Sequence, residues 1–84
     1  MMYGRRGLDT AEGVLIALRH CSADEAFHEI IGVSHRHQVP VFTLAEALVN
    51  AAAGCRGYDE TSAGRAVMIE WGALLGASST AAAG

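Results

Sequence analysis

The residues best suited to bind a partner are cations at the ends of two expected helices. His35, Arg36 and His37 are consecutive, so they combine one fixed positive charge with two imidazoles, a residue type that changes charge near neutral pH. Arg19 stands at the end of an earlier segment. Positive charge at these positions suits an anionic partner such as a phosphate group. It equally suits the negative end of a solvated helix, so both interpretations stay open.

Metal binding and catalysis have little support in this sequence. His28 and His35 are spaced to share a helix face, but no Cys or acidic residue completes a set of three or four ligands at helical spacing. Cys21 and Cys55 are far apart and form no Cys-x-x-Cys pattern. The sequence also contains no nucleophile in a strand–turn–helix elbow and no glycine-rich phosphate loop. We therefore expect no metal, no cofactor and no enzymatic activity.

Length and composition predict one small domain. The chain has 84 residues, a formal net charge of −3 and only 6% aromatic residues. A chain of this size buries roughly 60–65% of the surface that its unfolded form exposes, so its core is modest and a deep cleft is not expected. There is no run of ~18 apolar residues and no pattern of a signal peptide. We expect no membrane span and a cytoplasmic location.

Three helix starts are predicted by one pattern, in which a cap residue is followed three positions later by Glu. In such a capping box the cap oxygen accepts from a free backbone N–H, and the Glu accepts from the N–H of the cap. Gly13 lies inside the first helix, where its cost of ~1 kcal/mol relative to Ala indicates the close approach of another backbone. The boxes Asp9–Glu12, Ser22–Glu25 and Thr43–Glu46 predict helices over about 10–19, 23–37 and 43–53, with Pro40 in the second connector.

The remainder of the chain predicts one more helix. Residues 55–60 are expected to form a loop, and the apolar spacing over 62–75 predicts a helix. Residues 78–84 are small and are expected to form a flexible tail. No alternation typical of a strand is present. The fold class is therefore all-α: a compact three-helix bundle over 8–54, with a C-terminal fourth helix in 55–84.

Two aromatic residues each have two interpretations. Trp71, with Leu74 and Leu75, forms either a lid on the three-helix core or half of a dimer contact. Phe42 either stacks on an unpaired base or packs onto the helix that follows it. Because two-fold dimers are the commonest soluble assembly and the core is thin, we expect a homodimer.

Three strings of residues recur in an order and at spacings that resemble the ANTAR family. They are residues 11–15 (AEGVL), 21–27 (CSADEAF) and 44–49 (LAEALV), and the resemblance covers about 8–53. ANTAR domains are RNA-binding transcription antitermination regulators. The resemblance implies a three-helix domain that grips tandem RNA hairpins, prevents a terminator from forming, and performs no catalysis. We take Arg36, His35 and His37, helped by Arg19, as the candidate RNA contacts.

Two departures from the family pattern remove positive charge. ANTAR domains commonly carry a basic residue where this chain has Glu12, and a polar, basic run where it has the uncharged residues 38–42. Phosphate contacts supply most non-specific affinity for nucleic acid, so these changes keep an alternative open. It is a protein-interaction or dimerisation module that retains the scaffold without RNA readout. A helix-turn-helix DNA binder is disfavoured, because the third helix offers only Glu46 and Asn50 as outward polar groups.

Overall fold

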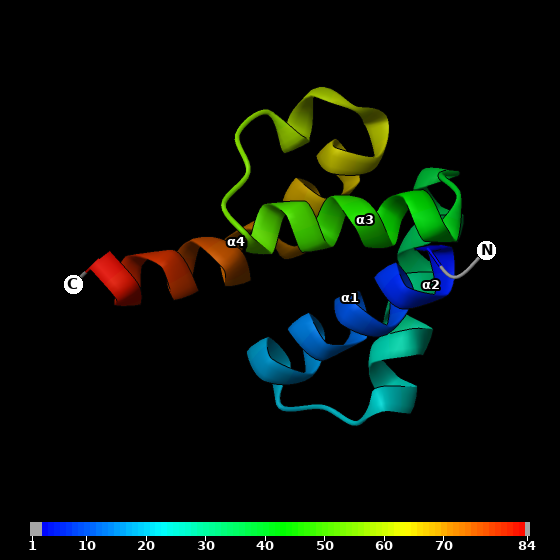
Figure 1. Cartoon of the computed structure of the whole chain (residues 1–84), viewed down its shortest axis with the longest axis horizontal. Coiled ribbons are helices and arrows are strands. Elements are labelled where there is room, and N and C mark those ends of the chain that lie inside the picture. The colour runs from blue at the N-terminus through cyan, green and yellow to red at the C-terminus, as the bar shows by residue number, and fades with distance from the viewer. Residues whose placement is uncertain (1–2, 84) are drawn as a thin grey trace.

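The computed structural model describes residues 3–83, and their side chains over 7–76, as a bundle of helices without a strand in the described range (Figure 1). The predicted all-α fold is confirmed, with three helices followed by a fourth. The elements are α1 (Tyr3–Arg19), α2 (Ala23–His37), α3 (Val41–Ala52), the short 3-10 helix η1 (Tyr58–Glu60) and α4 (Ser62–Ala83).

The four α-helices share one hydrophobic core. α1 and α3 make the most extensive contact, and α4 packs on α3 while η1 covers the start of α4. The C-terminal turns of α4 project from the bundle (Figure 1). Many core residues are small, so the helices approach closely. The buried apolar residues are Ala11, Leu15, Ala26, Ile30, Val33, Val39, Leu44, Ala45, Ala47, Leu48, Ala63, Ala66, Val67 and Trp71.

The capping box at Ser22 starts a helix as predicted, but the other two boxes do not. The Glu25 N–H donates to Ser22 Oγ at 3.1 Å, and the Ser22 N–H donates to Glu25 Oε1 at 2.9 Å. α1 begins at Tyr3, so Asp9 lies inside the helix and caps nothing. α3 begins at Val41, and Pro40 is its N-cap, with the extended backbone usual at that position (φ −61°, ψ 141°) and no side-chain cap hydrogen bond. Thr43 is therefore also inside its helix.

A buried serine fixes the turn between α2 and α3. Gln38 ends α2 in the left-handed conformation with φ 55°, and the Val39 N–H then donates to the carbonyl of Ser34 at 3.1 Å. In return, Ser34 Oγ donates to the carbonyl of Val39 at 2.6 Å. This exchange satisfies a buried hydroxyl and sets the direction in which the chain enters α3.

The close backbone approach predicted at Gly13 is wrong, and a different glycine makes one. Gly13 is exposed, and a Cβ placed there would meet nothing within 4 Å. At Gly64 a Cβ would overlap the backbone carbonyl of Tyr58, so η1 can lie against α4 only because residue 64 has no side chain. The Gly64 N–H also donates to Thr61 Oγ1 at 3.0 Å, which holds the start of α4 beside η1.

α4 is longer than the sequence predicted. Its helical backbone continues past Leu75 to Ala83, so residues 78–83 of the expected tail are helical and Gly84 lies outside the described range. Trp71 is fully buried in the shared core. Its side chain therefore acts as a lid on the three-helix core and is not available for a dimer contact. Within the described range, no helix has the length and apolarity that crossing a membrane requires.

Candidate functional site

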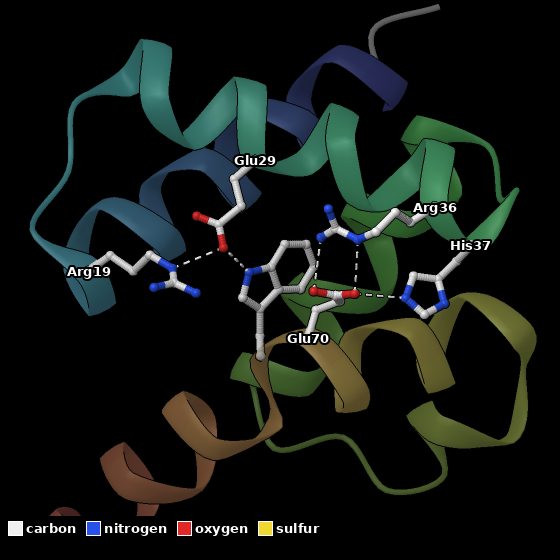
Figure 2. A network of polar contacts seen from close by, with 6 residues as sticks. Arg19, Glu29, Arg36, His37 and Glu70 are labelled. Carbon is white, nitrogen blue, oxygen red and sulfur yellow. Dashed lines mark hydrogen bonds and ion pairs between the residues drawn. The ribbon is translucent and has the colours of Figure 1, made fainter.

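Arg36 and His37, two of the predicted contact residues, meet a carboxylate of α4. Arg36 Nε and Nη2 donate to Glu70 Oε2 and Oε1 at 3.3 and 3.0 Å. His37 Nε2 lies 2.9 Å from Glu70 Oε2. Figure 2 shows the guanidinium and the imidazole reaching this one carboxylate from the end of α2. The fixed charge of Arg36 is therefore paired within the protein.

Arg19 belongs to a second group of contacts, centred on Glu29 of α2. Arg19 Nε donates to Glu29 Oε2 at 2.9 Å, and Trp71 Nε1 donates to the same oxygen at 2.6 Å. Trp71 follows Glu70 directly in α4, so adjacent residues of one helix reach the two groups (Figure 2). We call Arg19, Glu29, Arg36, His37, Glu70 and Trp71 the α2–α4 seam.

His35 is the predicted contact residue that stays outside the seam. Its side chain is exposed, and no described side chain makes a hydrogen bond or ion pair with it. The structure therefore brings Arg36 and His37 together, places Arg19 in a separate pair, and leaves His35 facing solvent. All four lie at the C-terminal ends of α1 and α2.

Sequence reasoning missed Glu29, Glu70 and the polar role of Trp71. Glu70 is paired with residues far away in the chain, so no local spacing indicates the contact. One signal was present: Glu70 is the single charged residue between Arg65 and the C-terminus. A charged residue in an otherwise apolar stretch is seldom buried unless it is paired.

Two carboxyl groups, Glu70 in the seam and Glu12 in α1, have pKa values shifted in opposite directions. Hydrogen bonds from His37, and then from Arg36, lower the pKa of Glu70 below its ordinary value. Partial burial raises the pKa of Glu12, and the charges of Asp9 and Asp24 raise it further. The surface around Glu12 is therefore negative, at the position where the family pattern commonly has a basic residue.

Two of the four arginines within residues 7–76 have no acidic partner in that range. Arg56 and Arg65 are exposed, and neither makes a side-chain hydrogen bond or ion pair in that range. The same part of the chain holds no group of three or more His, Cys, Asp or Glu side chains placed to bind a metal. Phe42 is 53% exposed in the first turn of α3, so it is accessible to a stacking partner.

A half-open groove of about 320 Å³ separates the outer face of α3 from the segment that leads into η1. The two outward polar residues of α3 that the sequence identified, Glu46 and Asn50, lie on one wall. Arg56 and Tyr58 are on the opposite wall. The groove thus carries polar groups on both walls, and no seam residue lines it.

A scan against protein-family models matches residues 2–49 to the ANTAR domain, which is more than half of the chain. The chain belongs to the ANTAR family. ANTAR domains are helical, non-catalytic regulators that bind RNA and act in transcription antitermination. No curated protein and no solved structure matched the chain. The ANTAR match covers α1, α2 and most of α3, so the seam residues Glu70 and Trp71 of α4 lie beyond it.

Proposed function

We propose that this ANTAR chain is a non-catalytic, cytoplasmic RNA-binding regulator that promotes transcription through a terminator by binding tandem RNA hairpins. The observation that carries the proposal is the family match over the three helices that form most of the core. The helical fold and the cations at the ends of α1 and α2 support it. Pairing of two of those cations limits how strongly RNA can be held.

The proposed RNA contacts are Arg36, His35 and His37, with help from Arg19. The Arg36 side chain is 62% exposed and that of Arg19 is 41% exposed, so both are accessible from solvent despite their carboxylate partners. Binding to loop or single-stranded RNA releases about 0.7 counterions per neutralised phosphate. With two or three such contacts, the logarithm of affinity should fall with the logarithm of salt concentration at a slope of roughly −1.5 to −2.

The assembly that we propose is a homodimer formed through the outer face of α4. Ile69 is 70% exposed and Met68 is 43% exposed, whereas Trp71 is fully buried and contributes no interface area. No charged residue follows Glu70, so the part of α4 beyond it would bring no like charges together in a dimer. This surface also favours the alternative function, an interaction module without RNA readout.

A binding titration separates the two functions. The wild-type chain is tested against a tandem hairpin, an RNA containing one of the two hairpins, and an unrelated RNA duplex. We expect a clear preference for the tandem hairpin, because family binding depends on paired hairpins. Equal affinity for all three RNAs would reject the proposal in favour of the interaction module.

Arginine variants then locate the contact. Arg36→Gln should weaken binding to the tandem hairpin and make the salt slope shallower by about 0.7, the value for one lost phosphate contact. Arg65→Gln is the matched control, because Arg65 is exposed, carries the same charge and makes no side-chain hydrogen bond or ion pair with the described residues. Identical behaviour of the two variants would exclude Arg36 as an RNA contact.

A further inference from the structure

Glu70 occupies the donors that a phosphate would use. A guanidinium binds a carboxylate and a phosphate in the same way, through two N–H groups that point to two oxygens. In this chain Arg36 Nε and Nη2 both donate to Glu70, and His37 Nε2 reaches the same group. The N–H groups that point to Glu70 cannot serve it and an RNA phosphate at the same time.

We propose that α4 is an internal competitor of RNA: the Glu70 carboxylate fills an anion site formed by Arg36 and His37, and an RNA phosphodiester binds there only by displacing it. This inference rests on the proposed function and adds regulation to it. The competitor lies outside the ANTAR match, which ends at residue 49.

Trp71 keeps the competitor in position. Its side chain is fully buried, and its Nε1–H donates to Glu29, so α4 is anchored one residue away from Glu70. Glu29 also holds Arg19, the remaining paired candidate contact. The docked position of α4 therefore sets the availability of Arg36, and Trp71 shares its acceptor oxygen with Arg19.

The geometry allows exchange. The Arg36 side chain is largely exposed, and its Nη1 makes no hydrogen bond with the described residues. An approaching phosphate can contact that free nitrogen before Glu70 leaves. Solvent-exposed ion pairs are weak, so an RNA that offers several phosphates can displace this one. The carboxylate consequently reduces affinity without abolishing it.

Neutralising Glu70 should strengthen RNA binding. Glu70→Gln removes the competing charge but keeps the length of the side chain, and the affinity for the tandem hairpin should rise about fivefold, the factor that matches a solvent-exposed ion pair. Glu60→Gln is the control: it makes the same change in net charge at an exposed residue outside the seam and should change affinity by less than about twofold. In an Arg36→Gln background the gain from Glu70→Gln should disappear.

A second variant and a spectroscopic measurement show whether a change in affinity comes from the carboxylate or from loss of structure. Glu70→Asp keeps the charge but shortens the reach to Arg36 and His37, so it should give a smaller gain of the same sign. Trp71 is the one tryptophan of the chain, and its unshifted emission in each free variant would show that α4 remains docked.

Each outcome decides between the claims. If wild type and Glu70→Gln bind the tandem hairpin equally, the competition is rejected and the proposed function stands. If Glu60→Gln gives the same gain as Glu70→Gln, net charge accounts for the effect and the competition is again rejected. If neither wild type nor any variant binds the hairpin, both the competition and the proposed function fall.

Discussion

One carboxylate, that of Glu70, accepts from two side chains of α2, and its ionisation should be visible in the stability of the fold. His37 and Arg36 lower its pKa in the folded chain. Ionised Glu70 therefore contributes stability that is complete above the ordinary carboxyl pKa of ~4.3 and is lost as pH falls through the lowered folded value.

The free energy of unfolding of wild type and of Glu70→Gln, measured by urea titration at several pH values, tests this expectation. Wild type should have the larger free energy of unfolding. Its advantage over Glu70→Gln should be complete near neutral pH, shrink below pH ~4.3 and vanish in stronger acid. A difference that does not change with pH would contradict the ion pairing. Glu60→Gln provides the baseline, because the Glu60 side chain makes no hydrogen bond or ion pair with the described residues.

The pKa of Glu12 is shifted in the opposite direction to that of Glu70. Its raised pKa means that the ionised carboxylate opposes folding, through partial burial and repulsion by Asp9 and Asp24. A basic residue at this position would relieve the repulsion and add a cation for phosphate. The ionised Glu12 therefore has a cost in the stability of the fold.

At the scale of the helix, substitution of the cap residue distinguishes the true start of α2 at Ser22 from the apparent start of α3 at Thr43. Ser22→Ala should lower the free energy of unfolding by about 1 kcal/mol, because the N–H of Glu25 loses its acceptor. Thr43→Ala has the same sequence context three residues before a Glu, yet Thr43 lies inside α3. That variant should change the free energy by less than about 0.5 kcal/mol.

Denaturant unfolding of the two variants under one condition gives the comparison. Equal losses of unfolding free energy in the two variants would mean that α3 starts at Thr43 in solution and not directly after Pro40. A Ser22→Ala variant as stable as wild type would contradict the capping box.

Local patterns predicted the presence of the helices better than their ends. The apolar stripes and the Ser22 box located α2 within its observed bounds, because both depend on residues three and four apart. The start of α1 and the length of α4 were missed, since few local signals stop a helix there. Pro40 lies in the connector as predicted, as the N-cap of α3, but the helix begins at Val41 and not at Thr43.

The contacts between helices were beyond the reach of sequence reasoning for a different reason. The residues Arg36, His35, His37 and Arg19 were identified from their type and from their positions at helix ends. Their partners Glu70 and Glu29 depend on how α4 crosses α2, which no spacing along the chain encodes. The close approach at Gly64 depends equally on tertiary packing.

At the scale of the whole molecule, the charge balance sets the terms on which RNA can bind. The net charge is −3, the region around Glu12 is acidic, and two candidate arginines are already paired. Long-range attraction to RNA is therefore weak, and recognition has to come from a small number of close contacts. Such a chain gains more from freeing one cation than a strongly basic protein would.

The measurement that tests the central claim most directly is transcription through a terminator in a purified system. The template carries tandem hairpins that overlap the terminator, and a matched template lacks the second hairpin. Read-through should rise with the concentration of the wild-type chain on the first template and stay unchanged on the second. Unchanged read-through on the first template, at concentrations that saturate the hairpins, would contradict the proposal, as would an equal rise on both templates.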